Sequence, residues 1–146
     1  MNKVLPRGKK TYTKEQRERR RVMNMRYEQY ERPAYLIDLA RSQGHLQRTF
    51  SELTGETAQD KLRYLKPDEL PRCEARLEMT GCAPDGRIAT DIHHKAKRGK
   101  LEPHGGDALL NDSTLFVGLC RTCHDYIHAH PEWAYDESWL VKRNVI

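Results

Sequence analysis

The four cysteines constrain the fold of this chain more than any other feature, because they form two pairs at distant places in the sequence. Cys73 and Cys82 are separated by eight residues, and Cys120 and Cys123 by two. Two such pairs in an intracellular chain indicate a tetrahedral zinc site, in which four thiolates complete the coordination sphere. The alternatives are two disulfides in an exported protein, or buried free thiols. A zinc knot would be structural, because it ties the start of the C-terminal half to its final helix.

The composition indicates why such a tie is needed. Hydrophobic residues make up 37% of the 146 residues, charged residues make up 32%, and the mean hydropathy is −0.90. A hydrophobic core can form but stays thin, so part of the chain is expected to need a metal or a partner. No apolar run reaches the roughly 20 residues of a membrane-spanning helix, and no hydrophobic stretch follows the basic N-terminus. We therefore expect a cytoplasmic protein that has no membrane partner.

Positive charge is concentrated in the N-terminal third of the chain. Residues 1–50 contain 13 Lys and Arg against five Asp and Glu, a net charge of +8, whereas the remainder is slightly negative. A basic arm on a nearly neutral body indicates a polyanionic partner such as a nucleic acid. Arg17, Arg20 and Arg21, on the polar face of a predicted helix, are the candidate contacts. A solvated tail that is kept basic for solubility is the alternative.

The pattern before residue 70 predicts mainly helices. Thr13 and Gln16 fit a capping box at the start of a helix over residues 14–31. Pro33 is expected to open a second helix over residues 34–42, and shorter helical signals cover residues 46–53 and 58–65. Two prolines near residue 70 mark a boundary. We therefore divide the chain into a basic helical region, residues 1–70, and a second domain, residues 71–146.

The second domain has a different pattern. Residues 88–92 and 115–119 read as short apolar strands, separated by a glycine-containing loop over residues 95–109. Residues 121–129 read as a helix that ends before Pro131. The expected order is strand, loop, strand and helix, which with the N-terminal helices predicts an α+β fold.

Six of the seven histidines also fall between positions 73 and 130. His93 and His94 are adjacent at a predicted strand end, where neighbouring side chains point to opposite faces. His124 and His128 are four residues apart on the predicted helix, so they share a face. A lone histidine is more often an ordinary surface or core residue than a ligand. Two pairs on facing elements instead predict a mononuclear metal site with an additional base.

These segments together resemble the HNH endonucleases, in particular small versions carried by bacteriophages and bacteria. The resemblance covers roughly residues 70–146 and is carried by Cys73-Glu-Ala-Arg76, Asp91-Ile-His-His94, Leu110-Asn-Asp112 and Cys120-Arg-Thr-Cys-His-Asp-Tyr-Ile-His128. It implies a C-terminal ββα-metal (HNH, His-Me finger) domain with a structural zinc knot, behind the basic helical region. The implied location is the cytoplasm of a bacterial or phage-infected cell.

The resemblance implies a role for each residue of the site. His94 is similar to the family's general base, which takes a proton from the attacking water, and His93 stands at the family's first metal ligand. His124 and His128 stand where helix-borne ligands lie, or where one of them positions the scissile phosphate. Asp91 is expected to brace a histidine. The ligand set permits Mg²⁺, Mn²⁺, Ni²⁺ or Zn²⁺ as the catalytic metal.

Asn111 is the candidate for the family's middle asparagine, which orients the loop that carries the base. Many family members place that asparagine nine residues before the histidine of the Cys-His pair, where this chain has Leu115. Either the loop carries an insertion, or Asn111 caps a turn with Asp112 and Ser113.

Four cations follow the histidine pair within six positions, namely Lys95, Lys97, Arg98 and Lys100. On a loop beside a phosphodiester site, they are expected to contact the DNA backbone and give affinity that is independent of sequence. An ordinary solvated loop is the alternative.

The predicted activity is metal-dependent hydrolysis of DNA phosphodiester bonds, as an endonuclease or a nickase. A neutral imidazole suits general-base work near neutral pH, and one divalent cation can act as the Lewis acid. The alternative is a non-catalytic zinc-knot module that binds nucleic acid or protein. A related alternative is an accessory factor in a larger phage or host complex, such as a phage packaging partner.

Overall fold

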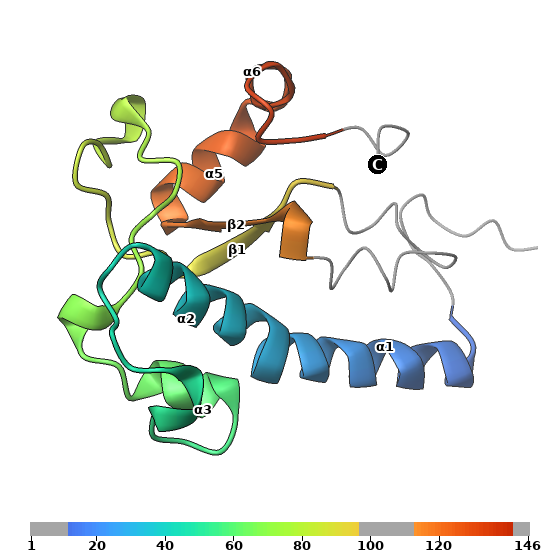
Figure 1. The fold of residues 1–146 in the computed structure, drawn as a ribbon. Helices are drawn as coiled ribbons and strands as arrows, with labels where there is room; N and C mark the ends of the chain where they lie inside the picture. Colours follow the sequence, from blue (N-terminus) through green and yellow to red (C-terminus); the bar gives the residue numbers. More distant parts are fainter. Residues whose placement is uncertain (1–11, 97–112, 142–146) are drawn as a thin grey trace, which may run out of the picture.

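The computed structural model describes residues 12–96 and 113–141 (Figure 1). These residues form helices and a two-stranded antiparallel sheet, in agreement with the α+β class. The principal elements are α1 (Lys14–Arg26), the π-helical turn η1 (Tyr27–Glu31), α2 (Arg32–Ser42), α3 (Ala58–Arg63), β1 (Asp91–His94), β2 (Phe116–Leu119), α5 (Arg121–Ala129) and α6 (Pro131–Asp136). Within the described ranges no helix is long and apolar enough to cross a membrane.

The N-terminal helices form one uninterrupted run instead of the two separate helices predicted from Pro33. Pro33 lies in the first turn of α2. It has no N–H to donate to the carbonyl four residues earlier, and its ring would press against that carbonyl. The backbone accommodates the ring by widening into η1, where the N–H of Arg32 donates to the carbonyl of Tyr27. The predicted break was therefore wrong, because the helix widens at this point and does not end.

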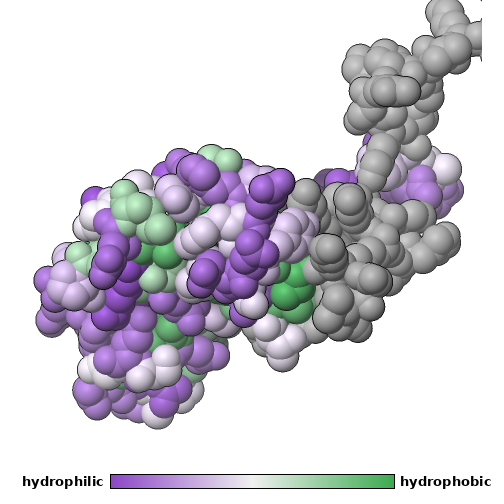
Figure 2. Space-filling model, turned by 90° about the horizontal axis from the view of Figure 1, so that it is seen from above, coloured by the Kyte–Doolittle hydropathy of each residue, from purple (hydrophilic) through white to green (hydrophobic). Residues whose placement is uncertain are grey.

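α1 extends away from the other described elements in Figure 1, and none of its residues is buried. The predicted capping box at its start is confirmed. The Thr13 hydroxyl accepts from the N–H of Gln16 at 3.1 Å, and the Gln16 side chain accepts from the N–H of Thr13 at 2.9 Å. The face of the molecule shown in Figure 2 is largely hydrophilic, with apolar residues in small separate areas. A polar helix without buried residues depends on such caps and on its ion pairs.

The sheet confirms the second predicted strand and shifts the first. β1 and β2 pair antiparallel, with His94 opposite Phe116. The strand predicted over residues 88–92 is only partly correct. Ile88 forms an isolated bridge with Arg72, and three residues later the chain pairs with β2 instead. The backbone is paired both at Ile88 and in β1, but side-chain packing decides where its partner changes from Arg72 to β2.

The sheet lies between helices on its two faces, as Figure 1 shows for α2 and α5. Val117 and Leu119 belong to the hydrophobic cluster that contains the cysteines and α5. Ile92 and Phe116 belong to the cluster on the side of α2 and η1. Side chains alternate along each strand, so consecutive residues of β1 meet different helices. This alternation sets the surroundings of His93 and His94.

Contacts join the helices before residue 70 to the sheet after it. Gly118 marks the close approach of α2, because a Cβ at this position would lie 2.7 Å from Cδ2 of Leu39. The hydroxyl of Tyr35 donates to Oε2 of Glu74 at 2.8 Å, and the same oxygen accepts from the N–H of Gly118 at 2.6 Å. The division of the chain near residue 70 stays a prediction.

The remaining helical predictions have mixed outcomes. α5 has the predicted bounds, and α3 lies within the helical signal over residues 58–65. The signal over residues 46–53 gives only a 3₁₀ turn, Phe50–Glu52. α6 was not predicted, because Pro131 was read only as a stop. Its fixed φ and missing N–H also suit the first turn of a new helix.

Candidate metal centres

The four cysteines lie together in the core, although they come from distant segments. Cys73 and Cys123 are 0% exposed, and Cys82 and Cys120 are 3% exposed. Their sulfur atoms all lie within 4.8 Å of one another, and none of the four is in a disulfide. Four buried cysteines this close together can bind a structural metal such as zinc. The cluster joins the segment before β1 to the first turn of α5.

Backbone turns around the cluster direct polar hydrogens at the sulfurs. The N–H of Arg87 donates to Sγ of Cys82 at 3.2 Å, and the N–H of Cys123 donates to Sγ of Cys120 at 3.4 Å. Gly86 makes the first contact possible, since its φ of +80° is a conformation that side chains disfavour. Such donors stabilise thiolates. Burial nevertheless raises the pKa of Cys123 to about 12, so a cation is needed to hold this sulfur as a thiolate.

A second group contains His93, His124 and His128. One ring nitrogen of each lies within 4.8 Å of those of the other two. His93 comes from the face of β1 that meets α5, and the other two lie one turn apart on α5. His93 is fully buried, His124 is half-buried and His128 is exposed, so the group opens to solvent on the side of His128.

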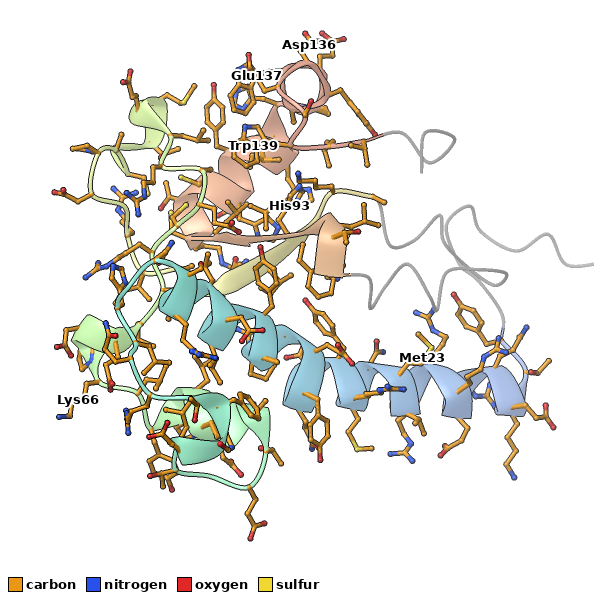
Figure 3. The ribbon with its side chains drawn as sticks, viewed as in Figure 1. Met23, Lys66, His93, Asp136, Glu137 and Trp139 are labelled. Atoms are coloured by element: carbon orange, nitrogen blue, oxygen red, sulfur yellow. The ribbon has the colours of Figure 1, made fainter. Side chains whose placement is uncertain are left out.

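The tautomer of His93 is fixed by a carbonyl far along the chain. Nε2 of His93 lies 2.6 Å from the carbonyl oxygen of Trp139, and Figure 3 shows the two residues on facing segments. A carbonyl only accepts, so Nε2 carries the proton and Nδ1 presents a lone pair. Nδ1 is buried and has no hydrogen-bond partner among the described residues. Burial lowers the pKa of His93 to about 4, which outweighs the opposite effect of the Trp139 carbonyl. This ring is therefore neutral at pH 7.

His124 is held by Asp91, the first residue of β1. Nδ1 of His124 lies 2.9 Å from Oδ2 of Asp91, and the same oxygen lies 3.2 Å from Nε of Arg121. Nδ1 donates to the carboxylate, so Nε2 is the nitrogen left to face the group. Nε2 of His128 lies 3.0 Å from Nε2 of His124. Nitrogens that share one metal ion at bond lengths of about 2 Å are separated by roughly this distance.

His94 lies outside this group, on the opposite face of the strand. Its ring centroid is 4.9 Å from that of Phe116 and 5.2 Å from that of Tyr27, on η1. The alternation predicted for the adjacent histidines is therefore confirmed. One ring turns to α5 and the other turns to the N-terminal helices.

The predicted DNA-contacting residues are only partly described. Lys97, Arg98 and Lys100 lie outside the described residues, and so does Asn111, the candidate middle asparagine. The backbone N–H of Lys95 donates to the carbonyl of Leu115, and its carbonyl accepts from the N–H of Val141. Arg17, Arg20 and Arg21 lie on α1, where Arg21 forms a 2.7 Å ion pair with Glu18 and the Arg20 guanidinium lies 4.7 Å from the centre of the Tyr12 ring.

Two residues near the histidines were missed by the sequence analysis. Trp139 acts through its carbonyl, which has no sequence signature. Tyr27 lies within the helix predicted over residues 14–31, and only its depth of burial, 4% exposed, distinguishes it from its neighbours.

Comparisons with protein-family models, with curated proteins and with solved structures gave no match for this chain. The interpretation of the site therefore depends on its own geometry.

Proposed function

We propose that this protein is a metal-dependent DNA endonuclease or nickase of the HNH type. The observation that carries the proposal is the three-histidine group, in which nitrogens from β1 and α5 come together beside a separate, closed cysteine cluster. The order of β1, β2 and α5 agrees with a ββα-metal arrangement. Four cysteine ligands fill the coordination sphere of a structural metal, whereas three histidine ligands leave coordination positions for water and substrate.

The donors fit a divalent cation. His93 offers Nδ1 as a buried lone pair without a hydrogen-bond partner among the described residues, and His124 offers Nε2 because Asp91 holds its other nitrogen. Histidine ligands with positioned partners of this kind are typical of metal sites. A bound Mg²⁺, Mn²⁺, Ni²⁺ or Zn²⁺ would supply Lewis-acid stabilisation of charge on the phosphate oxygens.

The side chains around the group have separable tasks in this proposal. The Trp139 carbonyl and Asp91 fix the tautomers of two ligands. His94 accepts the proton of the attacking water. Its ring packs on Tyr27 and Phe116 and is not part of the three-histidine group, so in this proposal it is not a metal ligand. A zinc ion in the cysteine cluster would hold α5, and therefore two of the histidines, against the segment before β1.

DNA is proposed as the substrate on grounds of charge. α1 carries six cations and two carboxylates over 13 residues, and none of its residues is buried. A protruding basic helix of this kind can contact phosphates without reading sequence. The predicted DNA-contacting cations Lys95, Lys97, Arg98 and Lys100 would add to this contact.

The test is cleavage of supercoiled plasmid. The purified protein should produce open-circle or linear DNA with Mg²⁺ or Mn²⁺, and His94→Ala should slow cleavage by roughly 10²–10⁴-fold while it keeps the fold and the zinc. His130→Ala is the matched control, because His130 ends α5, stacks on Tyr126 and lies outside the histidine group. If His94→Ala cut as fast as the parent, the proposed mechanism would be wrong.

The second candidate is a zinc-knot module that binds nucleic acid or an accessory partner without cutting it. The basic, unburied α1 and the cysteine cluster are compatible with this function, because neither requires the histidines. Plasmid binding without cleavage under every divalent metal tested would favour it.

A further inference from the structure

Tyr27 belongs to the N-terminal helices but packs against the proposed catalytic histidine. It is 4% exposed, and its ring centroid lies 5.2 Å from that of His94, with the two planes inclined by 44°. Phe116 completes the contact, since its ring lies edge-on to both Tyr27 at 6.0 Å and His94 at 4.9 Å. The imidazole therefore rests on two aromatic rings from different parts of the chain.

The π turn explains how a helix residue reaches this position. Tyr27 and Tyr35 both contact Phe116, with centroid distances of 6.0 and 5.6 Å. In an unbroken α-helix, residues eight positions apart differ in direction by about 80°. The wider turn η1 rotates the chain less per residue and brings the two tyrosines closer to one face. Widened turns of this kind occur frequently at functional sites.

We infer that Tyr27 is a positioning residue, which holds the His94 imidazole in the orientation needed to accept a proton from water. This inference rests on the proposed endonuclease function. Tyr27 does not contact substrate in it, and acts by restricting the ring on which the reaction depends. The N-terminal helices thereby contribute to the chemistry as well as to any contact with DNA.

The packing supports a positioning role. His94 is the last residue of β1, and the backbone on either side of it is held, because the N–H of Lys95 donates to the carbonyl of Leu115 at 2.9 Å. What is left to restrain is the orientation of the ring. Phe116 restrains the ring from the paired strand, and Tyr27 restrains it from the helix. Removing one of two restraining rings frees rotation about the side-chain bonds. Misplacing a reacting group by about 1 Å costs up to 10²-fold in rate.

The experiment measures metal-dependent cleavage kinetics of the full chain on a defined duplex. Tyr27→Ala and Tyr27→Leu should lower kcat by roughly 10- to 100-fold and leave KM within about twofold, because DNA binding is untouched. Tyr27→Phe keeps the ring and should restore kcat to near the parent value. Tyr27→Leu, which keeps apolar volume, carries the test if Tyr27→Ala fails to fold.

Two controls separate positioning from loss of stability. Tyr30→Ala changes an exposed tyrosine of the same turn, and should leave kcat unchanged. Leu36→Ala removes a buried side chain of the same cluster that is not one of the two rings packed on His94. It should lower the melting temperature but keep kcat when assayed well below its unfolding transition.

The outcomes distinguish a failure of the proposed nuclease function from a failure of the role inferred for Tyr27. An inactive parent protein would overturn the proposed function and this inference together. An active parent with unchanged kcat in Tyr27→Leu would overturn the inference alone, and so would an equal loss of kcat in Leu36→Ala. Loss of activity in Tyr27→Phe would indicate that Tyr27 acts through its hydroxyl and not through ring contact, and would also refute the inference as stated.

Discussion

Asp91→Asn tests whether the carboxylate beside His124 sets the metal affinity of the histidine group. The Asp91 side chain is 12% exposed and that of His124 is 19% exposed, so their 2.9 Å contact is largely shielded from water. The carboxylate keeps the proton on Nδ1, and so leaves Nε2 oriented as the metal-binding nitrogen. Asparagine has nearly the same shape but no charge. Its amide oxygen can still accept from Nδ1, so the loss comes from charge and not from packing.

The expected size of the effect follows from comparable sites. Removing the carboxylate partner of a metal-binding histidine typically lowers metal affinity by about 10- to 100-fold, or about 1.4–2.7 kcal/mol. The ion pair between Asp91 and Arg121 adds little to this figure, because the Arg121 side chain is 72% exposed. The cysteine cluster should keep its metal, since Asp91 does not belong to it.

Titration with Mn²⁺, followed by electron paramagnetic resonance, measures this affinity directly. Asp125→Asn is the matched control, because it removes the same charge from an exposed position of α5 next to His124. The parent and Asp125→Asn should bind Mn²⁺ about equally, and Asp91→Asn more weakly. Equal affinity in all three proteins would refute a bracing role for Asp91.

Two other outcomes are expected. Cys120→Ser should release zinc and unfold the domain, because the cluster joins α5 to the segment before β1. Metal analysis should find one tightly held zinc in the parent protein. A parent protein that is well folded without zinc would exclude the knot. In the metal-free protein, burial lowers the pKa of His93 from 6.5 to about 4, so its contribution to stability is present above pH 6.5 and is lost as the pH falls toward 4. The free energy of unfolding should drop by up to about 3 kcal/mol over that window in denaturant titrations, and His93→Gln should flatten the drop.

The sequence predicted the features that depend on local spacing. The pair four residues apart, His124 and His128, shares a face because α-helical geometry requires it, and α5 has the predicted bounds. The contact between the N–H of Cys123 and Sγ of Cys120, within one helical turn, is local in the same way. These features are determined by a few neighbouring residues, so a pattern in the sequence suffices to predict them.

Other features depended on competition between a local signal and packing. Pro33 was read as the start of a new helix, yet the existing helix widens before it and continues, because Tyr27 in the turn and α2 after it both pack on the sheet. The predicted first strand lies three residues too early, because Ile88 is paired with Arg72 before the chain reaches β2. Propensity gives the extended or helical state, but available partners decide where it begins and ends.

The sequence by itself therefore determined which residues are able to hold metals, and the tertiary structure decided how they are arranged. The partner of His93 is a carbonyl 46 residues away, and that of His124 is a carboxylate 33 residues away. Tyr27 reaches His94 from a helix that begins before the predicted domain boundary. Such contacts arise where separate segments pack on the two faces of one short sheet. No periodicity within a single segment encodes them, because each depends on the position of another part of the chain.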